Sequence, residues 1–228
     1  MWGVAAVDDF SHARMKMVDS QLRTEGVTDY DILAVMGSVP RELFVPPDQR
    51  ALAYLDSDIP IKSAAGGQSR YLMEPAPFAR LLQLAEIDKG DVVLDIGCGR
   101  GYSAAVLCHL ANYVVALDSD QGLVAEALQQ LRDLGLDNAK VVLGPLDVGY
   151  PSAGPYDVIF VDGAVEVLPA SLFGQLKQGG RLVAVVGYGR SAAATLYTKT
   201  DNQIGRRVAF NADVRPLPGF RKPAAFVF

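Results

Sequence analysis

The sequence has little of the material from which several common kinds of site are built. It contains two cysteines, Cys98 and Cys108, and two histidines, His12 and His109, in 228 residues. A disulfide is therefore not expected, and the cysteine usage fits a reducing cytoplasm. Neither histidine suggests a pair of base and nucleophile, and both are interpreted as structural.

A long apolar run and an excess of positive charge are also missing. No uninterrupted apolar stretch is long enough to span a bilayer, and the opening residues, MWGVAAVDDFSHAR, have no basic leader. The net charge is −5, and the lysines and arginines are scattered, which argues against a nucleic-acid partner. With 50% hydrophobic and 21% charged residues, we expect a cytoplasmic globular protein without membrane or nucleic-acid partners.

The chain is interpreted as one domain that opens with a helical extension, residues 1–60. A first helix over residues 10–26 and a second over 28–40, with Thr28 as its N-cap, are predicted. The apolar residues that share a face of the first helix are Met15, Val18 and Leu22. Those of the second helix are Ile32, Leu33 and Met36. Residues 61–75 are then expected to form a loop.

Residues 76–228 alternate short apolar strands with helices. Strands are expected at residues 92–96, 113–118, 140–144, 156–162 and 181–187, and helices at 74–87, 101–111, 120–135 and 169–180. This alternation predicts an α/β fold with a doubly wound, mostly parallel sheet covered on both faces. Residues 192–200 and 203–210 look like two antiparallel strands, and residues 221–228 like a final strand.

A glycine-rich turn follows the first of these strands, with Gly97, Gly99 and Gly101 after Asp95. Such a turn lets a ligand approach the backbone and points helix N–H groups at it. A dinucleotide fingerprint would place its third glycine at the position of Tyr102, so an NAD-dependent oxidoreductase is disfavoured. The pattern instead resembles the S-adenosylmethionine site of Rossmann-like methyltransferases, and these five residues are candidate cofactor ligands.

Asp118 ends the next apolar run, at about the distance from the glycines where an acidic residue grips ribose hydroxyls in such folds. An acidic residue there also counts against the 2′-phosphate of NADP. The alternative is that Asp118 caps the following helix, a role that Asp120 could fill instead. We expect Asp118 to bind the ribose.

Residues 17–47, MVDSQLRTEGVTDYDILAVMGSVPRELFVPP, closely resemble the opening of protein-L-isoaspartate O-methyltransferases. The stretches VLDIGCGRGYSAAVL, QLKQGGRLVAVVG and DVRPLPGF resemble that family's cofactor turn, its late helix-to-strand step and an element near its end. The resemblance implies a Rossmann-like fold and transfer of a methyl group from S-adenosylmethionine to a carboxylate in isoaspartyl peptides or proteins. A carboxylate is already ionised at neutral pH, so this transfer needs positioning and desolvation rather than a general base.

The sequence departs from the family at the loop over residues 61–75. The family carries Gly-Gln-Thr-Ile-Ser there, and the resemblance implies that this element lines the pocket for the isoaspartyl carboxylate. This chain keeps Gln68 but continues Ser69, Arg70, Tyr71 without the Thr-Ile-Ser triplet. Gln68, Ser69 and Arg70 are our candidate substrate-side residues, with Arg70 either pairing with a carboxylate or lying in solvent.

Two further departures lie at strand ends. Leu146 and Asp147 follow Pro145 where the family has Gly-Asp-Gly, and the resemblance implies that the family's Asp holds the amino group of adenine. Pro145 has no N–H to donate, so Leu146 would offer adenine an apolar wall. Asp147 would reach the amino group or lie in a surface turn. Asp162 stands where the family has Thr or Ser, at a strand's carboxyl end, where α/β proteins bind ligands. These three are candidate cofactor residues. A metal at Asp162 is not expected, because no Asp-Asn pair ends the next strand.

Three functions stay open at this point. The first is isoaspartyl repair by carboxyl methylation, which the resemblance implies. The second is a diverged methyltransferase that acts on another carboxylate or a hydroxyl, suggested by the loss of Thr-Ile-Ser. The third is a protein that binds the cofactor without turnover.

Overall fold

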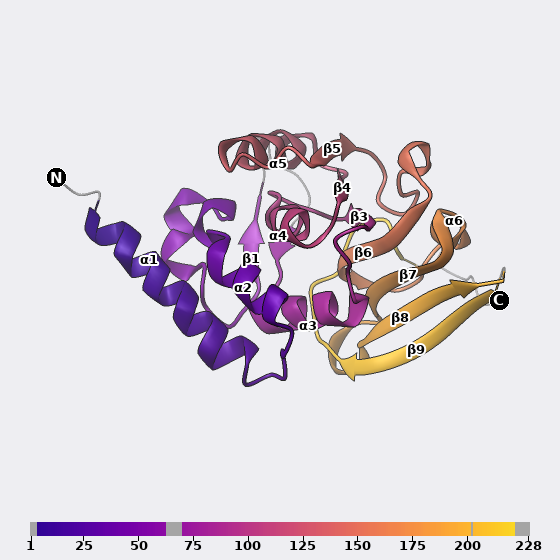
Figure 1. The fold of residues 1–228 in the computed structure, drawn as a ribbon, viewed down its shortest axis with the longest axis horizontal. Coiled ribbons are helices and arrows are strands. Elements are labelled where there is room, and N and C mark those ends of the chain that lie inside the picture. The colour runs from indigo at the N-terminus through magenta and orange to yellow at the C-terminus, as the bar shows by residue number, and fades with distance from the viewer. Residues whose placement is uncertain (1–3, 63–69, 202, 222–228) are drawn as a thin grey trace, which may run out of the picture.

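The computed structural model describes residues 4–62, 70–201 and 203–221, and side chains are described from residue 9 onward. Figure 1 shows a sheet with helices packed against it, and the N-terminal helix at the opposite end of the molecule from the last two strands. The α-helices are α1 (Val4–Met17), α2 (Tyr30–Ser38), α3 (Pro75–Ala85), α4 (Tyr102–Leu110), α5 (Gln121–Asp133) and α6 (Ala170–Gly174). Among the described residues, none of the helices is long and apolar enough to cross a membrane.

Seven strands form the main sheet in the spatial order β5-β4-β3-β6-β7-β8-β9. They are β3 (Val92–Ile96), β4 (Tyr113–Asp118), β5 (Ala139–Leu143), β6 (Tyr156–Val165), β7 (Leu176–Val186), β8 (Ala193–Thr200) and β9 (Gln203–Asn211). The first five strands in this spatial order, β5, β4, β3, β6 and β7, are parallel to one another. Strands β8 and β9 continue the sheet with antiparallel pairing. The predicted α/β class, the parallel core and the antiparallel end are confirmed.

The chain reverses direction across the sheet between β3 and β6. From β3 it runs outward through β4 to β5, and it then returns to the other side of β3 as β6. Loops that leave the two halves of such a sheet diverge at this point and leave a crevice outside the carboxyl ends of the strands, where open α/β sheets bind ligands. The glycine turn after β3 lies at this switch point.

The central strands β3, β4 and β6 are buried on both faces, as expected for strands of continuous apolar residues, whereas β9 is exposed along nearly all of its length. Val93 on β3 belongs to the larger core cluster, which includes apolar residues of α2, α3 and α4. Its neighbours Leu94 and Ile96 belong to a second cluster on the other face, together with Leu172 of α6 and Phe220. A sheet packed on both sides leaves its strand ends as the place for a ligand.

The N-terminal extension is helical, with local differences from the prediction. A π-helical turn over Val18–Leu22 follows α1 and is followed by α2 and two 3₁₀ turns, Arg41–Phe44 and Pro47–Leu52. This wider turn rotates the buried face, so Met17 lies in the core and Met15, predicted to share that face, is 54% exposed.

The N-cap of α2 is also one residue later than predicted. Asp29 accepts hydrogen bonds from the N–H groups of Asp31 and Ile32. The N–H of Thr28 donates instead to the side chain of Gln83, so tertiary contact takes Thr28 out of the capping position. The predicted buried face of Ile32, Leu33 and Met36 is correct.

Two other expectations need correction. The predicted loop over residues 61–75 includes strand β2 (Arg70–Leu72), which pairs antiparallel with β1 (Ile59–Ile61). The predicted helix over 169–180 shrinks to α6, because Gln175 donates to the carbonyls of Val148 and Ser171 and β7 has already begun at Leu176. The predicted final strand lies almost wholly outside the described residues.

Candidate active site at the switch point

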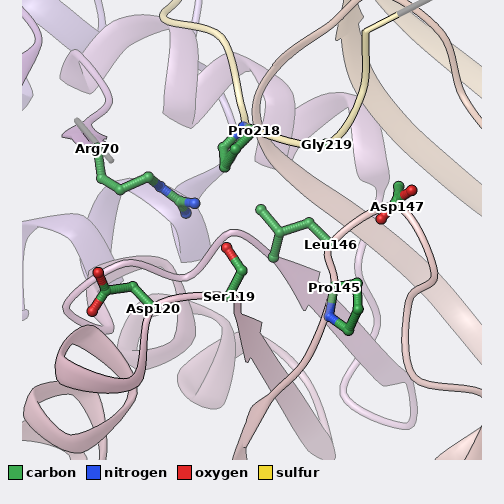
Figure 2. A pocket seen from close by; sticks show the side chains of 8 residues that line it. All are labelled: Arg70, Ser119, Asp120, Pro145, Leu146, Asp147, Pro218 and Gly219. Carbon is green, nitrogen blue, oxygen red and sulfur yellow. The ribbon is translucent and has the colours of Figure 1, made fainter. Parts of the chain in front are cut away.

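A cavity of about 360 Å³ opens at the carboxyl ends of β4 and β5. Its lining residues come from β2, the loops after β4 and β5, and the C-terminal segment: Arg70, Ser119, Asp120, Pro145, Leu146, Asp147, Pro218 and Gly219. Figure 2 shows Arg70 reaching into this space toward Leu146, with Asp147 beside Gly219. We call this the large cavity; its volume is within the range of small-molecule pockets, about 300–1,000 Å³.

The glycine turn lies beside the large cavity in left-handed backbone conformations. The φ angles of Gly97, Gly99 and Gly101 are +94°, +55° and +97°, which side chains rarely allow. Close packing adds a second requirement, because a Cβ on Gly97 would lie 2.9 Å from Leu217 and 3.2 Å from Nη2 of Arg70. The glycines therefore let β2 and the C-terminal segment approach the turn.

Asp118 lies at the end of β4 and is fully buried. Its Oδ2 accepts from the N–H of Gly99 at 2.9 Å and from Nη2 of Arg70 at 2.6 Å, and its Oδ1 accepts from the N–H of Asp120 at 3.0 Å. Asp118 thus holds the glycine turn and the next loop together. Asp120, not Asp118, caps α5, by accepting from the N–H groups of Gly122 and Leu123.

Arg70 is also buried, with 4% of its surface exposed, and forms an ion pair with Asp118. Its Nη1 has no hydrogen-bond partner among the residues that the structure describes. A buried guanidinium nitrogen that donates no hydrogen bond lowers the stability of the fold, unless a ligand supplies an acceptor for it. Of the two interpretations of Arg70 from the sequence, the position in solvent is wrong.

A second, much narrower space adjoins the large cavity at Arg70. It is lined by Asp58, Arg70, Tyr71, Met73, Asp162, Gly163, Val214, Arg215, Pro216 and Leu217. The C-terminal segment forms one side, since the N–H of Ala164 on β6 donates to the carbonyl of Arg215 and the N–H of Leu217 donates back to that of Ala164. We call this the narrow cleft. Arg70 belongs to both spaces.

Asp162 is the acidic group on β6 in the narrow cleft. Burial raises its pKa to about 7, while Ser103 and the guanidinium groups of Arg70 and Arg41 oppose that rise. Its Oδ1 has no hydrogen-bond partner within the described parts of the chain. Burial therefore favours the protonated form of Asp162 up to near neutral pH, in a cleft of about 10 Å³.

Asp95 and Tyr102, two of the candidate cofactor residues, lie under the turn rather than in the large cavity. Asp95 is fully buried and accepts from the hydroxyl of Ser103 at 2.7 Å. Burial and the nearby carboxyl of Asp162 raise the pKa of Asp95 well above its usual range. Tyr102 packs its ring against Phe44 and Phe78. The role of Tyr102 as a cofactor residue stays a prediction.

The chain is similar over most of its length to one family of known proteins. The family model for protein-L-isoaspartate(D-aspartate) O-methyltransferases matches residues 13–215. The chain belongs to this family. It is 38% identical to protein-L-isoaspartate O-methyltransferase 2 of Anaeromyxobacter sp. over 90% of this chain and 82% of the relative. It is 40% identical to the enzyme of Herpetosiphon aurantiacus over 79% of this chain and 78% of the relative.

Solved structures of the family share the fold. One protein-L-isoaspartate O-methyltransferase aligns with a TM-score of 0.78 and 29% identity, over 90% of this chain and 66% of that chain. A second, from Plasmodium falciparum and in complex with S-adenosyl-L-homocysteine, aligns with a TM-score of 0.74 and 20% identity over 89% of this chain and 96% of that one. The predicted family resemblance and the methyltransferase class are therefore confirmed.

The other candidate residues occupy different parts of the site. Leu146 and Asp147 line the large cavity, as their positions after β5 suggest. Asp162 lies in the narrow cleft and not in the large cavity, and its role as a cofactor residue stays a prediction. Gln68 and Ser69 lie outside the described residues, and their roles stay predictions. Within the described ranges, no group of three or more His, Cys, Asp or Glu side chains could hold a metal ion.

Several residues that shape the site could not be identified from the sequence. Ser119 and Gly219 line the large cavity, and Leu217 packs against Gly97 and Gly163. Arg41 is fully buried and joins the N-terminal extension to the loop before α3 by donating to the carbonyls of Ala53 and Met73. The only signal for Arg41 in the sequence is its place in residues 39–46, VPRELFVP, within the stretch that resembles the family, and that place predicts no contact.

Proposed function

We propose that this chain transfers the methyl group of S-adenosylmethionine to the side-chain carboxylate of isoaspartyl residues in proteins. The observation that carries the proposal is the family match over residues 13–215. The large cavity at the switch point supports it, because that is where the fold binds nucleotides.

The residues of the large cavity suit the adenosine part of the cofactor. Leu146 and Pro145 offer apolar surface to a purine ring, and Ser119 and Asp147 offer polar groups at its edges. The amide groups of the glycine turn at the start of α4 would face the methionine part. One contact does not fit as it stands: Asp118, which would hold the ribose, is covered by Arg70.

S-Adenosylmethionine supplies an electrophilic methyl group, which an acceptor carboxylate oxygen takes as the bond to sulfur breaks and its electron pair stays on sulfur. Carboxyl groups have an ordinary pKa of about 4, so the acceptor is ionised at neutral pH and no proton needs to be removed. The protein must then bring the two groups into line and exclude water. The narrow cleft offers a buried guanidinium for the acceptor and apolar surface from Met73 and Leu217.

A second candidate function rests on Asp162. A carboxyl group with a pKa of about 7 at the methyl-transfer end is suited to take a proton from an acceptor hydroxyl. A carboxylate acceptor has no need of such a base. This observation favours a diverged enzyme that methylates a hydroxyl as the alternative to isoaspartyl repair.

The test is methyl transfer from labelled S-adenosylmethionine to an isoaspartyl peptide, with the matched aspartyl peptide as control and calorimetry of cofactor binding on the same sample. Transfer to the isoaspartyl peptide alone supports the proposal. Tight cofactor binding without transfer to either peptide contradicts it. In that case an Asp162→Asn variant separates the alternatives, because it abolishes transfer to a hydroxyl acceptor and leaves a protein that only binds cofactor unaffected.

A further inference from the structure

Arg70 occupies the wall between the large cavity and the narrow cleft and lines both. Its Nη2 donates to Asp118 on the cofactor side. Its Nη1 is buried without a partner among the described residues. A single side chain therefore contacts the two spaces between which a methyl group has to pass.

The hydrogen bonds of Asp118 leave too little room for a ribose. A carboxylate offers about four lone-pair sites, and Asp118 already accepts from Gly99, Arg70 and the N–H of Asp120. Gripping both hydroxyls of a ribose needs two sites, and only about one remains. Asp118 is also fully buried, so a ribose cannot reach it while Arg70 stays in place. Of its three donors, two are backbone N–H groups, and Arg70 is the one that can turn away.

A displaced Arg70 needs another anion. A buried guanidinium that loses its counter-ion is strongly destabilising, so the side chain will not stay unpaired in the same place. The narrow cleft is the other space that it lines, and an acceptor carboxylate entering there would meet the fork of the guanidinium. Asp58 and Asp162 also line that cleft, but burial raises the pKa of both carboxyl groups, and Asp58 already pairs with Arg215. Both are therefore weaker partners for Arg70 than an ionised acceptor.

We infer that Arg70 exchanges partners during binding: it pairs with Asp118 until the ribose of the cofactor takes that carboxylate, and it then pairs with the acceptor carboxylate in the narrow cleft. The acceptor half of this inference rests on the proposed function. The exchange couples the two spaces, because each ligand favours the position of Arg70 that the other one needs.

The first test measures the affinity for S-adenosyl-L-homocysteine by calorimetry, without acceptor, on the full chain and its variants. Arg70→Met keeps the length of the stem and removes the competing charge, and it should bind three- to tenfold more tightly than wild type. Arg80→Met is the matched control. Arg80, on α3, lies over the ring of Phe210 on β9, outside both spaces, and its replacement should leave the affinity unchanged. Equal or weaker binding by Arg70→Met would overturn the inference, because Arg70 would then be a bystander or a cofactor ligand.

Arg70→Lys is the second variant, to be measured in case Arg70→Met does not fold. It keeps a positive charge beside Asp118. It should bind S-adenosyl-L-homocysteine with an affinity between those of wild type and Arg70→Met. Weaker binding than wild type would again overturn the inference.

The second test measures the affinity for an isoaspartyl peptide with and without saturating S-adenosyl-L-homocysteine. Wild type should bind the peptide at least fivefold more tightly when the product is bound, and Arg70→Met should lose this coupling. Peptide binding by wild type without coupling would overturn the acceptor half. If wild type does not bind the peptide at all, the proposed function fails, and the first test still decides whether Arg70 competes with the cofactor.

Discussion

The guanidinium carbon of Arg41 lies 4.8 Å from the centroid of the Tyr102 ring, so an arginine of the N-terminal extension stacks on the first residue of α4. Both side chains are buried. This contact ties the extension to the helix that starts at the glycine turn. The extension is therefore part of the scaffold of the site.

We expect Arg41→Met to lower the free energy of unfolding by about 3 kcal/mol, because it leaves the buried carbonyls of Ala53 and Met73 without their donors. Urea denaturation measures this. Arg23→Met is the control: Arg23 is 51% exposed and pairs with Asp19 one turn away, so its loss should change stability by less than about 0.5 kcal/mol. A loss below about 1 kcal/mol for Arg41→Met would show that the two bonds contribute little.

Gly101→Ala should destabilise the protein more than Gly135→Ala. Both glycines have positive φ, which costs an alanine about 1–2 kcal/mol. A Cβ on Gly135 meets nothing within 4 Å, whereas one on Gly101 lies 3.1 Å from the Cβ of Ala127 and 3.2 Å from its Cα. We expect about 1 kcal/mol for Gly135→Ala and about 3 kcal/mol or more for Gly101→Ala by urea denaturation. Equal losses would mean that α5 moves aside at little cost.

Asp162→Asn should stabilise the protein increasingly as the pH rises. Burial raises the pKa of Asp162 in the folded state to about 7, with Ser103, Arg70 and Arg41 acting against the rise and Asp118 adding to it. In the unfolded chain the group ionises near pH 4, so wild type loses stability between about pH 4 and 7 as the unfolded state gives up its proton first. Asparagine does not titrate. The stability difference between variant and wild type should therefore grow by about 2 kcal/mol from pH 5 to pH 8.

Urea denaturation of both proteins at pH 5, 6, 7 and 8 measures that difference. A difference that stays constant over this range would show that Asp162 is ionised throughout. A difference that shrinks would mean that the folded state favours the charged form.

Removing Asp118 should weaken binding of S-adenosyl-L-homocysteine by at least tenfold, because the ribose hydroxyls lose their acceptor. Asp118→Ala alone would also leave Arg70 buried without its counter-ion and so lower stability. The comparison is therefore made between Arg70→Met and Arg70→Met with Asp118→Ala, by calorimetry. Equal affinities would remove Asp118 from the ribose site.

The strands of the core could be predicted from the sequence because each contains a run of apolar residues, and β3 and β4 also stand between two helices. Burial on both faces requires such apolar runs. The helix over 169–180 was predicted too long because local preference was the only guide. Gln175 bonds to the loop before β6 and ends α6 early, and a Cβ on Gly180 would come within 3.0 Å of the carbonyl of Tyr156. These are contacts between distant residues, which local patterns do not contain.

The same division holds for the site. The position of Asp118 could be predicted because it follows from the length of one strand-helix-strand unit. Its partner Arg70 is 48 residues away in the sequence, and the pairing depends on the short β1–β2 hairpin that brings Arg70 to the glycine turn. The distance along the chain from the glycine turn therefore predicts the position of Asp118, but it does not predict that Arg70 covers it.

The segment from Asp213 to Phe220 crosses the strand ends after all the strands of the sheet have been made. It supplies Pro218 and Gly219 to the large cavity and places Leu217 on Gly97 and Gly163. The cavity therefore has its wall only when the residues beyond β9 are in place, although the glycine turn lies far upstream in the chain. Binding of a ligand thus depends on a segment that lies outside the strands, and cleavage before Asp213 would detach the wall of the cavity together with the core residues Leu217 and Phe220.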